Sequence, residues 1–184
     1  MVNWDELKIL CASCKKCNLY KTRTNIVLGK GNINTNLMFV AEAPGRQEDL
    51  TGTPFVGNSG QLFDKILETV DITRDEIYLT NIVKCRPPEN RNPTETEKQA
   101  CLPYLRNQVA LIHPKIIVCL GRVAAQTIIR SDFKIAKEHG NFFERKGYFL
   151  TATYHPSALL RDPSKKMSVW EDFKAIKLKF DELR

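Results

Sequence analysis

Four short apolar runs recur along the chain and predict four β-strands. They are Leu37–Ala41, Ile77–Thr80, Ile116–Leu120 and Phe149–Tyr154. The first three are continuously apolar rather than alternating, which is typical of parallel strands covered by helices on both faces. We therefore expect the four strands to form one buried, parallel sheet.

Helical patterns separate these runs. Amphipathic segments predict helices from Gly60 to Val70, from Gly121 to Ile129 and from Val169 to Leu183. Thr94-Glu95-Thr96-Glu97 is a capping box that predicts the start of another helix, which we expect to be kinked at Pro103. Strands that alternate with helices predict a layered α/β fold.

Residues that could line a ligand site follow three of the predicted strands. Glu42, Ala43 and Gly45 come after the first strand, Asn81 follows the second, and His155 follows the fourth. The carboxyl ends of parallel strands meet at one rim of the sheet, where ligands of such folds bind. The sequence therefore predicts a site at this rim.

Composition limits the class of protein. The 184 residues are 42% hydrophobic, which is enough for the core of one domain spanning residues 1–184. No apolar run approaches a membrane span, and the acidic N-terminus is unlike a secretory signal, so we expect a cytoplasmic protein. An excess of 28 Lys and Arg over 21 Asp and Glu suits a nucleic-acid partner, although a basic surface without a binding role is equally open.

The six cysteines indicate metal binding or buried thiols rather than disulfides in such a compartment. Two pairs of cysteines, Cys14 with Cys17 and Cys85 with Cys101, are predicted to form one metal site. The first pair lies in an N-terminal cysteine-containing segment of the domain. Cys11 is expected to pack in a helix, and Cys119 to be buried within a strand. Zinc and an iron–sulfur cluster both accept four thiolates, and the spacing slightly favours the cluster because only one pair is tight.

Three motifs, AEAPGRQEDLTGTPFVGNSGQL, LTNIVKCRPPENRNPT and YHPSALLR, are found together with these cysteines. In combination they resemble the family 4 uracil-DNA glycosylases of bacteria and archaea, over nearly the whole chain. The resemblance implies a three-layer α/β/α fold with a central four-stranded parallel sheet, and a [4Fe–4S] cluster. It also implies base excision repair, in which the N-glycosidic bond of uracil in DNA is hydrolysed to leave an abasic site.

The resemblance extends to the nucleophile and the partners. RQEDLTGTPF lacks the inserted basic loop through which a related branch crosslinks to the abasic product, so a monofunctional hydrolase that uses water is implied. The expected partner is single- or double-stranded DNA containing uracil. A monomer without membrane contact is expected.

Roles for the rim residues follow from the resemblance. A glycosylase flips its target base out of the duplex and reads it in a pocket. Phe55 would stack on the uracil, and Asn81 would pair with O4 and N3–H, its amide oriented by neighbouring hydrogen bonds. His155 would donate a hydrogen bond to the charge that develops on uracil O2.

The attacking water and the exclusion of thymine involve the first motif. Better-known relatives in the superfamily carry an Asp where this chain has Ala43, which leaves Glu42 and Asn90 to orient the water. Gly45 stands where those relatives have a bulky Tyr, so Glu48 is expected to crowd the pocket against the thymine methyl group.

Contacts to the DNA backbone and the base stack are assigned to the third motif. Ser157 and Arg161 would hold phosphates, although a surface cation is often merely solvated. Leu159 would be the wedge that fills the gap left by the flipped base, with simple helix packing as the alternative.

Two other classes of protein remain open at this point. One is a non-catalytic iron–sulfur nucleic-acid-binding protein associated with replication, and the other is a structural domain that binds zinc. A binding module has no need for Glu42, Asn81 and His155 on one rim, and a zinc protein would lack the brown colour of an iron–sulfur cluster.

Overall fold

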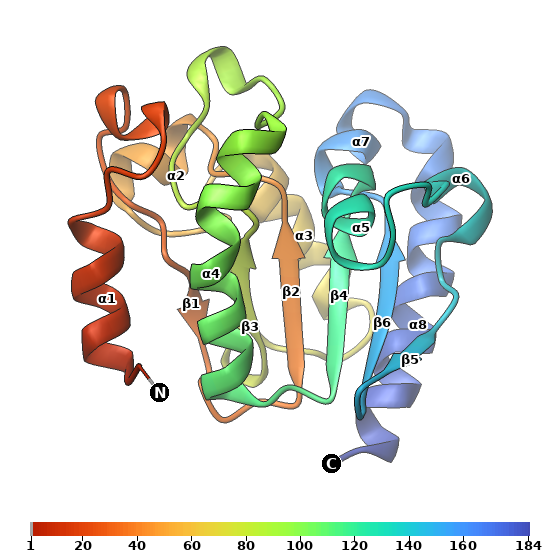
Figure 1. Ribbon diagram of the computed structural model, residues 1–184. Coiled ribbons are helices and arrows are strands. Elements are labelled where there is room, and N and C mark those ends of the chain that lie inside the picture. Colours follow the sequence, from red (N-terminus) through yellow and green to blue (C-terminus); the bar gives the residue numbers. More distant parts are fainter. Residues whose placement is uncertain (1) are drawn as a thin grey trace.

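The computed structural model describes residues 2–184 and places one six-stranded sheet between two layers of helices (Figure 1). The strand order is β1-β3-β2-β4-β6-β5. The strands are β1 (Lys30–Gly31), β2 (Leu37–Ala41), β3 (Tyr78–Asn81), β4 (Ile116–Leu120), β5 (Phe143–Arg145) and β6 (Tyr148–Thr153). β2 and β4 have the predicted bounds, and β3 and β6 are each displaced by one residue from theirs.

The sheet is mixed, unlike the four-stranded parallel sheet implied by the sequence. The four expected strands lie at its centre and run parallel to one another. β1 and β5 are short antiparallel strands added at the two edges. Neither has an apolar pattern, because edge strands largely exposed to solvent need none, so neither is visible in the sequence.

Two hydrophobic clusters, one on each face of the sheet, produce the three layers. Side chains alternate along β2, so that Met38 and Val40 join one cluster while Leu37, Phe39 and Ala41 join the other. The first cluster includes residues of α1 (Trp4–Ala12), α4 (Glu95–Ile112) and α5 (Arg122–Ile128). The second includes residues of α3 (Asn58–Glu68), α7 (Pro156–Arg161) and α8 (Lys166–Glu182). The expectation of an α/β fold is confirmed.

Local signals explain how several helices begin. The predicted capping box is present in α4, where Glu97 N donates to Thr94 Oγ1 at 3.2 Å and Thr94 N donates to Glu97 Oε2 at 2.8 Å. The helix continues through Pro103. A second capping box, between Asn3 and Glu6, begins α1, which the hydrophobic pattern alone did not predict.

The remaining helical segments are short turns around the rim and the connections. They are α2 (Arg46–Thr51), α6 (Ile135–Glu138), η1 (Asn18–Lys21), η2 (Arg74–Glu76), η3 (Pro88–Asn90) and η4 (Pro163–Lys165). None of the helices within residues 2–184 is long and apolar enough to cross a membrane.

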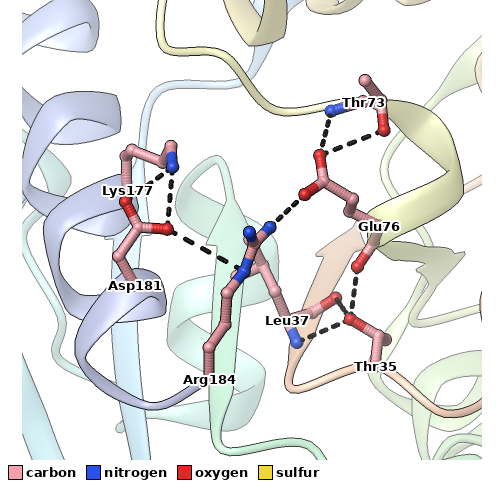
Figure 2. Close-up of polar contacts among 7 residues, drawn as sticks. All are labelled: Thr35, Leu37, Thr73, Glu76, Lys177, Asp181 and Arg184. Atoms are coloured by element: carbon pink, nitrogen blue, oxygen red, sulfur yellow. Dashed lines mark hydrogen bonds and ion pairs between the residues drawn. The ribbon is translucent and has the colours of Figure 1, made fainter.

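Polar contacts tie the C-terminus to η2 and to the start of β2 (Figure 2). Arg184 pairs with Glu76 and lies 3.8 Å from Asp181, which in turn binds Lys177 at 2.6 Å. Thr35 Oγ1 accepts from Leu37 N at 3.0 Å and donates to the Glu76 carbonyl. These contacts lie at the ends where the parallel strands begin, opposite the rim at which they end.

Candidate active site and cysteine site

A cavity of about 430 Å³ opens at the rim where the parallel strands end. Its walls come from the ends of β2, β3, β4 and β6 and the segments that follow them, from α2, from the loop before α3 and from η3. Every rim residue predicted from sequence lies on these walls except Leu159: Glu42, Ala43, Gly45, Glu48, Phe55, Asn81, Asn90, His155, Ser157 and Arg161. The expectation that the ends of the parallel strands converge on one site is confirmed for the residues that directly follow or end those strands, namely Glu42, Ala43, Gly45, Asn81 and His155.

Asn81 ends β3 and pairs in register with Ala41 of β2. The residue is only 2% exposed, and its side chain lines the cavity. The expectation that neighbouring hydrogen bonds orient its amide is wrong, because within residues 2–184 the amide has no hydrogen-bond partner. Its backbone carbonyl accepts a hydrogen bond from Lys84 Nζ at 2.7 Å. The backbone, rather than the side chain, therefore sets where the amide lies.

Phe55 lies in a loop with a tightly defined conformation. Its φ is +57°, a left-handed value that is uncommon for a bulky residue and must be held by its surroundings. Arg74 Nη2 donates to the Phe55 carbonyl at 2.7 Å, and the ring packs 5.1 Å from that of Phe63. Gly60 is required beside this loop, because a Cβ there would lie 2.1 Å from the Phe55 carbonyl oxygen.

The same loop is held from its other side by Glu48. The Glu48 carboxylate accepts from the backbone N–H groups of Val56 and Gly57, both at 2.9 Å. A Cβ at Gly45 would lie 2.7 Å from the second Glu48 oxygen. Gly45 therefore leaves the space that the carboxylate occupies, and Glu48 takes up part of the pocket wall as expected.

His155 caps α7, and its contacts determine which ring nitrogen carries the proton. Ser157 N donates to Nδ1 at 3.1 Å, and Ser157 Oγ lies 2.8 Å from the same atom. Because a backbone N–H can only donate, Nδ1 is the acceptor and the proton of the neutral ring is on Nε2. Burial, assisted by the charge of Arg161, lowers the pKa of His155 to about 4, so the ring is neutral near pH 7. A neutral N–H donor therefore remains at the cavity.

Glu42 and Asn90 lie on the walls of the same cavity. Burial raises the pKa of the Glu42 carboxyl, and the charges of Arg122 and Lys98 oppose this rise. Asn90 has a φ of +54°, and its Oδ1 accepts from Arg86 Nε at 2.7 Å. With its oxygen occupied, Asn90 has an NH2 group left to offer, while Glu42 offers a carboxylate that can accept.

The structure contradicts the assignment of Leu159 as a wedge. Leu159 is 3% exposed and packs in the hydrophobic cluster beneath α7. A wedge must reach the base stack, and a buried side chain cannot do so. The next residue, Leu160, is 53% exposed. The sequence could not separate two adjacent leucines, because only the rotation of α7 determines which one faces solvent.

A second, small cavity brings the cysteines together. Its lining includes all four predicted ligands and one further cysteine: Cys11, Cys14, Cys17, Cys85 and Cys101. All six cysteines of the chain are free thiols. Within residues 2–184, no three His, Cys, Asp or Glu side chains are grouped closely enough to hold a single metal ion. The thiols instead surround a shared space, and such soft donors fit a soft metal centre.

Polar groups around this cavity favour anionic sulfur. Arg23 Nη1 donates to Cys85 Sγ at 3.3 Å and to the Cys14 carbonyl at 3.0 Å, which joins the N-terminal segment to the loop after β3. The backbone N–H of Lys84 donates to Cys101 Sγ at 3.3 Å. Burial nevertheless raises the pKa of the Cys101 thiol to about 11, so the thiolate needs a bound cation to persist.

Cys11 and Cys119 differ in their surroundings. Cys11 is buried in the hydrophobic cluster under α1, as predicted, yet it also lines the cavity, and burial raises its pKa to about 12. Cys119 is fully buried within β4, where burial alone raises the pKa of the thiol. The prediction that Cys119 is a small buried side chain is confirmed.

Comparison with known proteins supplies the family. The model of the uracil DNA glycosylase superfamily matches residues 28–174. A type-4 uracil-DNA glycosylase of Archaeoglobus fulgidus is 43% identical over 184 residues, which cover 96% of this chain and 92% of that protein. The chain belongs to the type-4 uracil-DNA glycosylases. The resemblance expected from the three motifs is thereby confirmed.

Other type-4 and type-5 uracil-DNA glycosylases are similar as well. The type-4 protein of Thermotoga maritima is 42% identical over 168 residues, covering 89% of this chain and 88% of its own. A type-5 protein of Pyrobaculum aerophilum is 30% identical over 146 residues, covering 70% and 64%.

The extent of the type-4 similarity bears on the cysteines. The superfamily model begins at residue 28, after Cys14 and Cys17. The similarity to the Archaeoglobus fulgidus protein leaves out only 4% of the chain, about seven residues, fewer than the thirteen that precede Cys14. The C-x2-C pair therefore lies within the part of the chain shared with a type-4 uracil-DNA glycosylase.

Proposed function

We propose that this protein excises uracil from DNA by hydrolysing the N-glycosidic bond, with the rim cavity as its active site. One observation carries the proposal: Phe55, Asn81 and His155 line a single cavity, although they come from three distant parts of the chain. Stacking, reading and charge stabilisation of one flipped base require these three kinds of side chain together. A module that only bound nucleic acid would have no use for the combination.

Recognition of the base is assigned to two of these residues. The Phe55 ring offers an apolar face on which uracil stacks. The Asn81 amide donates through its NH2 group to uracil O4 and accepts from N3–H. Glu48 and Gly45 shape the wall against which the methyl group of thymine would press.

Bond cleavage is assigned to His155, Glu42 and Asn90. Leaving uracil takes the bonding electron pair and gathers negative charge on O2, to which the neutral His155 ring donates through Nε2. Glu42 accepts a hydrogen bond from the attacking water, and the Asn90 amide steadies it. As the C1′–N1 bond breaks, the water oxygen forms the new bond to C1′ and the water gives one proton to the Glu42 carboxylate, which releases it to solvent. The uracil anion takes up one proton from solvent, which leaves an abasic site and free uracil.

Contacts to DNA are assigned to α7. Arg161 binds a backbone phosphate at the mouth of the cavity. Ser157 holds the His155 ring, and we place it close to the same DNA strand as Arg161. Leu160, rather than Leu159, is the exposed apolar side chain able to fill the gap left by the flipped base.

We further propose that Cys14, Cys17, Cys85 and Cys101 hold a [4Fe–4S] cluster. Support comes from their shared cavity, from the donors Arg23 and Lys84 N directed at two of the sulfurs, and from the membership in the type-4 group. The cluster would supply a structural crosslink between the N-terminal segment and α4. We also propose that the protein acts as one monomeric domain in the cytoplasm, where reducing conditions would keep the cysteines from forming disulfides and available to bind iron.

The experiment is to incubate the purified protein with an oligonucleotide that carries one uracil, and then to treat the DNA with alkali. Alkali breaks the strand only where a base is missing, so strand cleavage at the uracil position is the expected result. An oligonucleotide with thymine at that position is the matched control. Retained DNA binding without cleavage would instead support the non-catalytic, replication-associated protein.

A further inference from the structure

Lys84 is a fully buried lysine that none of the proposed chemical steps uses. It is 1% exposed and lies between Asn81 and Cys85 in the chain. Its ammonium group has three acceptors: Thr80 Oγ1 at 2.6 Å, the Asn81 carbonyl at 2.7 Å and Gln108 Oε1 at 2.7 Å. Three acceptors match the three N–H bonds of an ammonium ion, so each of its donors is satisfied. A buried charge held this completely has a defined position.

The contact to Asn81 replaces a missing strand neighbour. The antiparallel strand β1 pairs with Tyr78 and Leu79 and ends before Asn81. On the other side of β3, Ile82 N donates to the Ala41 carbonyl of β2 at 2.8 Å, so the Asn81 carbonyl, one residue earlier, points away from β2. Lys84 Nζ therefore supplies the hydrogen bond that an adjoining strand would otherwise make.

Two of the groups that accept hydrogen bonds from Lys84, the side chains of Gln108 and Thr80, are themselves held in place by further hydrogen bonds. Gln108 of α4 donates through Nε2 to the Leu28 carbonyl at 2.8 Å and to Tyr78 Oη at 3.0 Å. Thr80 Oγ1 donates to the same carbonyl at 2.7 Å. The ammonium group is thus fixed by α4, by β3 and by the segment before β1. A buried polar network in which every member is satisfied is rigid.

We propose that Lys84 is a positioning residue for base recognition, which holds the Asn81 backbone so that the amide meets the pairing edge of uracil. The inference rests on the proposed role of Asn81. It follows from two facts together: the Asn81 amide has no hydrogen-bond partner within residues 2–184, and its carbonyl is held by Lys84. Removing the ammonium group frees the end of β3 and lets the reading amide move.

The test compares Lys84→Met with Tyr78→Phe. Methionine keeps most of the volume but cannot donate to the Asn81 carbonyl. The Tyr78→Phe protein loses a hydroxyl at the outer end of the same buried network without touching Lys84. For Lys84→Met we expect single-turnover uracil excision per iron-loaded molecule to fall about tenfold or more, while the affinity for abasic product DNA stays within about twofold. For Tyr78→Phe we expect both quantities within about twofold of wild type, even if its melting temperature falls.

Hydrogen–deuterium exchange provides a readout that does not depend on activity. We expect faster exchange at Ile82 and Val83, which follow Asn81, in Lys84→Met and unchanged exchange there in Tyr78→Phe. An inactive wild-type protein would overturn the proposed function, whereas the exchange comparison would still test Lys84.

Two results would overturn the proposal. One is wild-type excision and wild-type exchange in Lys84→Met. The other is equal losses in Lys84→Met and Tyr78→Phe, since these would reflect the network as a whole. Should Lys84→Met fail to fold or to bind iron, Lys84→Gln takes its place; its amide keeps two N–H donors on a shorter side chain, and an intermediate loss is expected.

Discussion

Replacing His155 with alanine removes the only donor that the site is proposed to direct at uracil O2. The ring is neutral and keeps its proton on Nε2, because Ser157 N donates to Nδ1. Its hydrogen bond strengthens only as charge develops on the leaving base. Loss of such a donor typically costs about 2.7–4 kcal/mol, or 100- to 1,000-fold in rate. We therefore expect His155→Ala to lower single-turnover excision by about 100- to 1,000-fold, with DNA affinity nearly unchanged.

The protonation state gives a second, independent measurement. With a pKa of about 4, the ring is neutral at pH 8, and only about 3% of it is protonated at pH 5.5. The ratio of wild-type to His155→Ala rates should thus stay constant across this range, because any titration of Glu42 affects both proteins and cancels. Ser157→Ala keeps the backbone donor to Nδ1, so we expect at most a severalfold loss.

Either of two results would refute this reasoning. A His155→Ala protein that cleaves at the wild-type rate but binds DNA weakly would make the residue a DNA contact. A rate ratio that changes severalfold with a midpoint near pH 6.5 would mean that the ring works as a cation with an ordinary pKa.

Three further experiments, which use five substitutions, test the other assignments. Asn81→Asp faces uracil O4 with a carboxylate, so uracil excision should fall at least tenfold and some cytosine excision should appear on matched oligonucleotides; unchanged uracil activity with intact cytosine would exclude Asn81 as the reader. Cys85→Ser should lose visible absorption and iron, whereas Cys119→Ser should keep both; full iron content in Cys85→Ser would remove that residue from the ligand set. Leu160→Ala should slow excision from duplex DNA more than from single strands, without lowering the stability of the protein. Leu159→Ala should instead cost about 2–5 kcal/mol of unfolding free energy, because it opens a cavity in the core. The reverse pattern would restore Leu159 as the wedge.

The central strands could be predicted because their signal is local. The runs at Leu37–Ala41 and Ile116–Leu120 are buried on both faces, so burial alone dictates a continuous apolar pattern, and the bounds agree with those observed. The edge strand Lys30–Gly31 has no such pattern, because this strand forms only through its pairing with β3 in the folded protein. Short helices such as Arg46–Thr51 likewise depend on what surrounds them.

The site could be predicted as far as strand ends determine it. Asn81 and His155 share a rim because both follow parallel strands. Two features needed the structure. Which of Leu159 and Leu160 is exposed depends on how α7 is rotated against the core. The role of Lys84 could not be anticipated, since lysine is almost always exposed and only the structure shows three acceptors around a buried ammonium group.

The most direct measurement of the central claim is the release of free uracil, counted against abasic sites, under single-turnover conditions with the iron-loaded protein. One uracil for each abasic site is expected from an oligonucleotide carrying a single uracil, and borohydride should trap no covalent protein–DNA adduct, because water is the nucleophile. The His155→Ala protein should release uracil about 100- to 1,000-fold more slowly. Bound DNA with no free uracil would contradict the assignment of a glycosylase, and a trapped adduct would contradict hydrolysis by water.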